Sequence, residues 1–418
     1  MSNRSNNKIT AKTQTILCLA MLLLFGATSC RKEIYLRANW PTMEISYNIN
    51  IDGLRIDWTA EWQYPVDAIG YTTNPQLVQG YIFDVSSGTR RYYSEHIFKT
   101  GQNRVSLKAG STYDMLFYNI GPSEEYNIIS SPDNHKTYTA TTNPTREQTS
   151  WLRTSSETNS RNNSGNDINV TIHNQPREEF GTLKSGLEIS EDLDKYEKEY
   201  DEKGNITYIY KIKTPMYPYT FIYQYQIVIL NNPDEKGNRI KNAKGVTVSG
   251  LAKSVELFSR KTSTSTIGIT ADELNPIKNV KNVRLQDGTI IDNADIFTTR
   301  IVTWGLPGIN PLESFISQYE TENQQGTSIR ATKADNDDES NKNLIGIGFT
   351  LRNDYQWTKI VDITRQMQEK PIGGVITIYI DAQEIPQELL DKKQQTTGGG
   401  FDANVKDWEN SFDSEVTI

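Results

Sequence analysis

Apolar and polar residues alternate along many short stretches of this 418-residue chain. In residues 54–62 (LRIDWTAEW), every even position is apolar and every odd position is polar or charged. A repeat of two is typical of a β-strand with one buried face, because successive side chains point to opposite faces of a sheet. The 22 Tyr and 7 Trp residues also favour strands. The sequence therefore predicts an all-β fold.

The predicted strands form two series, which we assign to two tandem β-sandwich domains, residues 30–175 and 176–418. The boundary lies at Gln175-Pro176, where the sequence turns strongly charged. Asp52-Gly53 predicts a hairpin, since a type I′ turn needs positive φ at both central positions. The predicted strands are residues 44–51, 54–62, 77–85, 89–98, 103–108, 112–120, 136–142, 168–172, 207–214, 219–230, 245–248, 295–304, 344–352 and 374–380.

Polar segments separate these strands. The sequence Asp-Glu-Lys-Gly-Asn occurs at residues 201–205 and 234–238, and both copies predict turns. Residues 145–167 predict a surface loop, and residues 309–343 a mobile loop. Residues 401–418 predict either a final strand or a solvated acidic tail, and we favour the strand.

The N-terminus has the pattern of a signal peptide. Residues 1–14 carry three basic residues and no acid, and residues 16–27 are almost wholly apolar. A membrane-spanning helix needs about 20 apolar residues, whereas signal-peptide cores are shorter. We expect residues 1–29 to be removed.

Cys30 indicates how the signal is processed. Ala27-Thr28-Ser29-Cys30 resembles the lipobox of bacterial lipoproteins, in which cleavage between Ser29 and Cys30 leaves a cysteine whose thiol carries the lipid. Several acyl chains, palmitate among them, give stable anchoring. The alternatives are an ordinary signal peptide or an uncleaved anchor. The only other cysteine, Cys18, lies in the signal, so we expect no disulfide.

The charge of the mature chain argues against one class of partner. Removing residues 1–29 takes away three basic residues, so the formal net charge changes from −8 to −11. An acidic protein of this kind does not favour nucleic acid.

Several short segments resemble a known group of proteins. They resemble, in order, a Bacteroides-type lipoprotein family of unknown function in the fimbrillin-like and fimbrial anchor group. The segments are Asp57-Trp58, Tyr81-Ile82-Phe83, residues 248–257 with the turn-like Ser249-Gly250-Leu251-Ala252, residues 361–364, Gly373-Gly374-Val375, Ile385-Pro386, and residues 399–408.

The resemblance implies two transthyretin-like β-sandwiches and an anchor, accessory or tip role in a fimbria-like assembly for cell adhesion. In this group, polymerising subunits lose their first strand when a trypsin-like protease cuts after a basic residue, and a neighbouring subunit donates a strand in its place. Arg37 and Arg55 are possible cleavage points. Anchors keep the strand and the lipid. We expect retention at the outer membrane, because only a few residues separate Cys30 from the first strand-like run at Ile34.

The sequence predicts no enzyme, cofactor or metal site. His96, His135 and His173 stand singly, and residues 335–339 lack the glycine and glutamate of a calcium loop. An alternative function is glycan binding at the cell surface through exposed aromatic residues. Trp151, in a polar loop, is the candidate contact, although a tryptophan packed back over the sandwich fits the same position.

Overall fold

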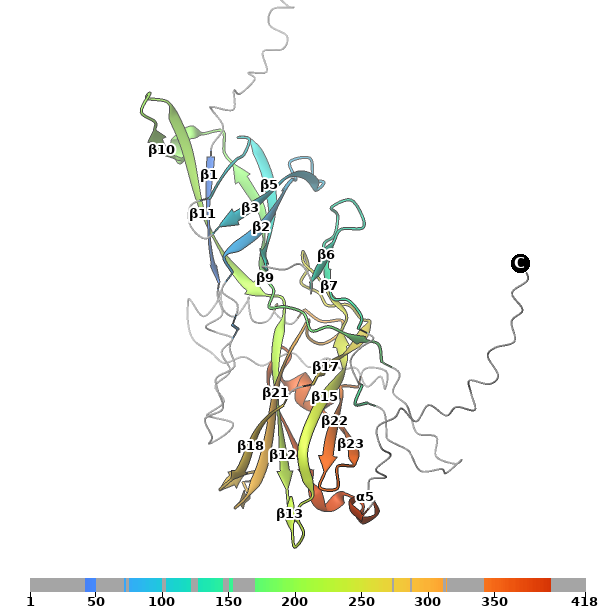
Figure 1. Ribbon diagram of the computed structural model, residues 1–418. Coiled ribbons are helices and arrows are strands. Elements are labelled where there is room, and N and C mark those ends of the chain that lie inside the picture. Colours follow the sequence, from blue (N-terminus) through green and yellow to red (C-terminus); the bar gives the residue numbers. More distant parts are fainter. Residues whose placement is uncertain are drawn as a thin grey trace, which may run out of the picture. The chain divides into compact units, whose positions relative to one another are not determined.

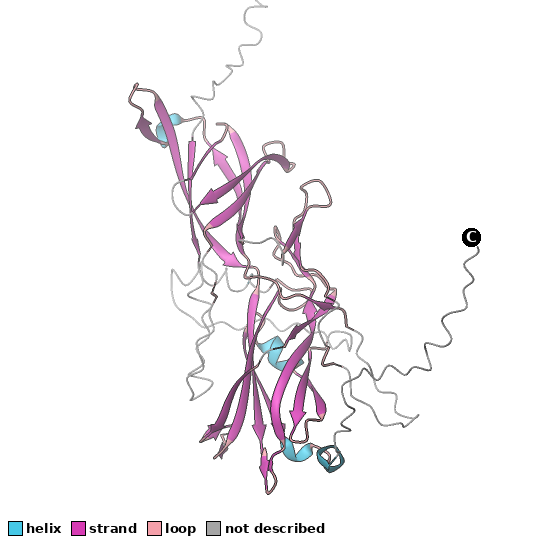
Figure 2. Ribbon diagram, in the orientation of Figure 1, coloured by secondary structure: helices cyan, strands magenta, loops and turns pink. Residues whose placement is uncertain are grey.

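The structure is a computed structural model, and strands dominate the part of the chain that it describes (Figure 2). This confirms the predicted all-β fold class. The described residues are 42–49, 71–72, 75–99, 103–121, 127–145, 150–152, 170–272, 274–285, 288–310, 313 and 342–391.

The chain divides into two compact units, each assembled from separate stretches of sequence. Unit 1 contains Met1–Ile49, Gln76–Phe117 and Thr182–Met216, and unit 2 contains Asn50–Pro75, Tyr118–Gly181 and Tyr217–Ile418. The predicted boundary between residues 175 and 176 would separate two domains that fold independently. It stays a prediction.

The first half of the chain forms strands β1 to β11 (Figure 1). Their bounds are β1 (Thr42–Ile49), β2 (Leu77–Asp84), β3 (Arg91–Lys99), β4 (Asn103–Ser106), β5 (Ser111–Ile120), β6 (Ile128–Ser130), β7 (Thr139–Thr141), β8 (Ile172–His173), β9 (Phe180–Ile189), β10 (Glu197–Tyr200) and β11 (Ile206–Pro218), with a 3-10 turn, η3 (Leu193–Lys195), before β10.

The second half forms the remaining strands and the short helices. Their bounds are β12 (Phe221–Leu230), β13 (Pro233–Asp234), β14 (Gly237–Asn238), β15 (Ile240–Ala252), β16 (Ser254–Glu256), β17 (Thr266–Ala271), β18 (Asn275–Val280), β19 (Val283–Arg284), β20 (Ile290–Ile291), β21 (Ala294–Thr303), β22 (Leu344–Leu351), β23 (Gln356–Asp362), α4 (Thr364–Glu369), β24 (Gly374–Asp381), η5 (Ala382–Glu384) and α5 (Gln387–Asp391).

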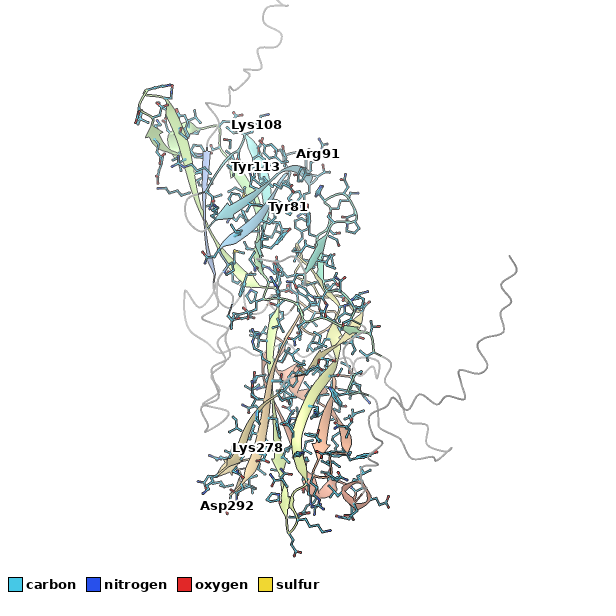
Figure 3. All side chains as sticks on the ribbon, viewed as in Figure 1. Tyr81, Arg91, Lys108, Tyr113, Lys278 and Asp292 are labelled. Carbon is cyan, nitrogen blue, oxygen red and sulfur yellow. The ribbon has the colours of Figure 1, made fainter. Side chains whose placement is uncertain are left out.

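One large sheet supplies the strands of unit 1. Its order is β3-β2-β5-β9-β11-β1-β4, and β10 pairs with β11 outside this path. Gly80 permits close packing on one face, since a Cβ there would lie 3.0 Å from Phe117 Cε1. Tyr113 is fully buried, and its hydroxyl accepts a hydrogen bond from the backbone N–H of Lys108 at 3.1 Å (Figure 3).

Unit 2 is a β-sandwich. The sheet β23-β22-β15-β17-β8 packs against the sheet β18-β21-β12-β24. Alternate residues of facing strands fill the core between them, as the period of two requires. The residues from β12, β15, β21, β22 and β24 in this core include Tyr223, Tyr225, Ile227, Val246, Val248, Phe297, Ile301, Ile345, Ile347, Phe349, Ile376 and Ile378.

Both Gly-Asn turns are confirmed. Gly204 lies between β10 and β11 with φ of +80°, and Gly237 begins β14 with φ of +98°. Glycine adopts positive φ without the penalty that a Cβ imposes. The Asp201 carboxylate accepts hydrogen bonds from the N–H groups of Lys203 and Asn205, each at 2.8 Å.

The segment at residues 249–252 was expected to turn, and this expectation is wrong. β15 runs on through these residues to Ala252, with a register shift between Val248 and Leu251. Gly250 has φ of +75°, and a Cβ there would meet the backbone of Lys342. The small residues therefore form a β-bulge inside a strand.

Five other predictions fall wholly or mainly outside the described residues. They are the strand at 54–62, the Asp52-Gly53 hairpin, the surface loop at 145–167, the mobile loop at 309–343 and the strand at 401–418.

Candidate functional site

The predicted processing residues lie outside the described part of the chain. Ser29, Cys30, Arg37 and Arg55 belong to this group, so lipidation and cleavage stay predictions. Among the described residues, no helix has the length and apolar character needed to cross a bilayer.

Strand β1 lies in sequence between the two possible cleavage points. It pairs in parallel with β11, from Thr42 opposite Ile209 to Ile49 opposite Met216. On its other side it pairs antiparallel with β4, from Thr42 opposite Ser106 to Ile45 opposite Asn103. β1 therefore occupies an internal position in the sheet, with β11 along its whole length on one edge and β4 along its first half on the other.

The two cleavage points would have opposite effects on this sheet. Cutting after Arg37 would leave β1 in place, whereas cutting after Arg55 would detach it from the rest of the chain. Loss of β1 would leave the facing edges of β11 and β4 unpaired. Buried residues on these two strands, Ile209 and Val105, flank the position. Unpaired backbone beside apolar residues is a template for a strand from another chain.

Another sheet edge is partly closed by a side chain. β24 ends the order of its four-stranded sheet. The Gln366 amide donates to the Thr377 carbonyl at 2.9 Å and accepts from the Thr377 N–H at 3.0 Å. A side chain that occupies edge hydrogen-bonding groups protects a sheet from unwanted pairing.

Trp151 lies over the outer face of one unit 2 sheet, on glycines of β15 and β22. Its backbone N–H donates to Thr247 Oγ1 at 2.9 Å. A Cβ on Gly348 would lie 2.6 Å from Trp151 Cδ2, and one on Gly346 would lie 2.5 Å from the Trp151 backbone carbon. The glycines therefore form a slot for this tryptophan. A glycan contact at Trp151 stays a prediction, and no contact of the residue in the described part of the chain favours it.

We predict that Gly348→Ala destabilises unit 2 by about 2 kcal/mol, because the new methyl group overlaps the Trp151 ring. Adding Trp151→Ala should remove most of this extra cost. Gly346→Ala should not be rescued in this way, since its methyl group meets the Trp151 backbone. Urea unfolding of the single and double variants measures the coupling. Equal rescue of both glycine variants would contradict the slot.

Two adjacent acids are buried immediately before β9, and sequence reasoning missed them. Glu178 and Glu179 are each 4% exposed. Glu178 accepts hydrogen bonds from the Thr72 N–H at 3.0 Å and forms an ion pair with Arg300. Glu179 accepts one from Asn127 at 2.9 Å, while its Oε1 is buried without a hydrogen-bond partner among the residues that the structure describes. In sequence, the pair looks like any charged surface segment.

The two acids help to hold neighbouring segments of unit 2. The Glu179 N–H donates to Thr220 Oγ1 at 3.0 Å, and the Tyr219 N–H donates to the Glu179 carbonyl at 2.7 Å. The Tyr71 hydroxyl donates to the Thr220 carbonyl at 2.8 Å. Burial raises the pKa of Glu179 to about 8, although the Asn127 hydrogen bond opposes the shift. With so little exposure, the pair serves the fold rather than a substrate.

Glu179 should make stability depend on pH. Its folded pKa lies above the unfolded value, so the stabilisation from the protonated carboxyl is full below about pH 4.5 and is lost as pH rises to about 8. The loss is at most about 5 kcal/mol. Glu179→Gln should flatten the urea-midpoint profile between pH 5 and pH 8, while Glu188→Gln, at an exposed position, should leave it unchanged. An unaltered slope in Glu179→Gln would contradict this assignment.

The histidines lie in separate environments. His173 is buried and its Nδ1–H donates to the Thr142 carbonyl at 2.8 Å. His135 bonds the Tyr138 hydroxyl, and His96 Nε2 lies 3.1 Å from Ser94 Oγ. Burial lowers the pKa of both His173 and His96. Within the described ranges, no three His, Cys, Asp or Glu residues are grouped to hold a metal ion.

Comparison with known proteins gives matches among solved structures alone. No family model matches the chain. No curated protein matches it either. A candidate adhesin from Bacteroides ovatus is 12% identical with a TM-score of 0.41, and the match covers 86% of this chain and 99% of that one.

Two further solved structures also match this chain. The fimbrial anchor protein Mfa2 from Porphyromonas gingivalis is 10% identical with a TM-score of 0.36, over 82% of this chain and 90% of that one. A candidate adhesin from Bacteroides thetaiotaomicron is 6% identical with a TM-score of 0.39, over 82% and 91%. The solved structures that resemble this chain therefore include candidate adhesins and a fimbrial anchor.

Proposed function

We propose that this protein is an outer-membrane lipoprotein, attached through acylated Cys30 and exposed at the cell surface, that anchors or completes a fimbria-like assembly in cell adhesion. The observation that carries the proposal is the position of β1, paired on both edges between β11 and β4. A first strand held in this way suits a subunit that keeps its N-terminus, and with it the lipid.

The same arrangement indicates how fimbrial subunits would join the chain. Because β1 fills its own sheet, the proposed anchor does not need a donated strand at that position. Contact with a fimbrial subunit would use another sheet edge or a strand that this chain donates, since backbone hydrogen bonds at an edge supply affinity and alternate side chains supply specificity. The segment at residues 401–418 is the proposed donor, as its apolar residues are spaced along it.

Immunogold electron microscopy of native cells tests this proposal. An antibody against residues 176–390 should place gold at the base or tip of filaments on cells with the natural chain. Cys30→Ala should remove the gold from the envelope and release the protein from the membrane fraction, because the lipid attachment is lost. Cys18→Ala is the matched control, since it changes a cysteine inside the signal segment, and it should keep the natural pattern.

Two different negative results would contradict the two parts of the proposal, the lipid anchor and the fimbrial role. Membrane retention of Cys30→Ala would contradict the lipid anchor. Gold spread evenly over an envelope without filaments would contradict the fimbrial role while leaving the anchor intact.

A further inference from the structure

The hairpin formed by β10 and β11 carries a row of aromatic side chains on one face. The register pairs Tyr200 with Ile206 and Lys198 with Tyr208. These pairs are two residues apart along each strand, so their side chains share one face of the ribbon. Tyr196 and Tyr210 extend the row, and their rings meet edge to face with centroids 5.8 Å apart.

This face becomes more exposed toward the turn. Tyr196 is 8% exposed, Tyr210 and Ile206 are each 37% exposed, and Tyr200 is 67% exposed. The buried end ties the row to unit 1, where the Tyr196 hydroxyl donates to the Ser190 carbonyl at 3.0 Å. The exposed end therefore presents aromatic surface on a fixed ribbon.

The charge on the aromatic face is balanced. Lys198 Nζ forms an ion pair with Asp194 at 2.9 Å and lies 5.9 Å from the centre of the Tyr208 ring. The opposite face carries its own pairs, Glu197 with Lys211 and Glu199 with Arg104. A face without surplus charge suits an uncharged ligand more than an anionic one.

The size of the aromatic face also limits the size and shape of the ligand that it can bind. Its exposed residues, Tyr200, Ile206 and Tyr210, offer roughly 300 Å² in all, and Tyr208 beside them is half-buried, against about 800 Å² per partner in a stable protein interface. The row from Tyr196 to Tyr200 extends roughly 13 Å along the strand. A narrow aromatic row of this length fits a short chain of flat rings with apolar faces and hydroxyl-bearing edges.

We propose that the aromatic face of the β10–β11 hairpin binds a neutral oligosaccharide, with sugar rings stacked on Tyr200 and Tyr208 and hydroxyl groups bonded by the Asp194 carboxylate and the tyrosine hydroxyls. This goes beyond the assembly role proposed above and does not depend on it. It also assigns glycan recognition to residues of the β10–β11 hairpin instead of Trp151.

A glycan array carrying neutral oligosaccharides of glucose, mannose, galactose and xylose, followed by calorimetry on the mature chain, tests the inference. The natural protein should bind at least one of these probes, with similar affinity at low and high salt because no net charge is involved. Tyr200→Ala and Tyr208→Ala should each weaken binding about tenfold through lost stacking. Tyr200→Phe should keep most of the affinity.

Tyr92→Ala is the matched control, because Tyr92 is an exposed tyrosine on β3 of the same unit, 43% exposed. It should bind like the natural protein. Circular dichroism checks that each variant is folded. The inference is overturned if no neutral probe binds, or if the Tyr200 and Tyr208 variants bind as well as Tyr92→Ala. Loss of a protein contact in these variants, with a silent array, would overturn it in favour of a protein partner.

Discussion

The hydrogen bonds that hold β1 between β11 and β4 decide whether the unit 1 sheet has an open edge at this position. β1 has a pairing partner on each edge, so β11 and β4 present no open edge toward it. Buried residues of β11 and β4 lie beside this position, and an empty position there would expose both backbone and apolar surface. With β1 present, the sheet is complete at this point. Without it, the same sheet would accept a strand from another chain.

The two units differ in how they use their apolar and aromatic residues. Unit 2 buries a large aliphatic and aromatic core between two sheets, and its outer face accepts Trp151 through glycines of β15 and β22. Unit 1 instead presents the β10–β11 hairpin with exposed tyrosines.

Strands with long apolar runs were predictable from the sequence. Strands that are defined mainly by hydrogen bonding to neighbouring strands were not. β5, β12, β21, β22 and β24 contain long apolar runs, and their predicted positions agree with the structure within about two residues. β9 (FGTLKSGLEI) and β23 (QWTKIVD) mix charges with apolar residues without a clear repeat of two, and they were missed because pairing with neighbouring strands defines them. β15 was predicted over residues 245–248, yet it extends over thirteen residues through bulges.

The candidate site residues were likewise hard to predict where their role depends on contacts between segments distant in sequence. The role of Glu179 depends on burial beside Asn127 and Thr220, which are distant in sequence. The tyrosines of the hairpin alternate visibly in the sequence, and the Asp-Glu-Lys-Gly-Asn turn joins their strands, but only the register shows that they share one face. The glycines beneath Trp151 have no sequence pattern that identifies the residue they accommodate.

Mass spectrometry of the mature N-terminus, on protein purified from native membranes, would show whether the chain keeps both the lipid and β1. We expect an N-terminal peptide that begins at Cys30, carries acyl chains and continues through β1 past Arg55. Protein that begins after Arg55 would contradict the retained strand and the lipid anchor together. Protein that begins after Arg37 would retain β1 and contradict the lipid anchor alone.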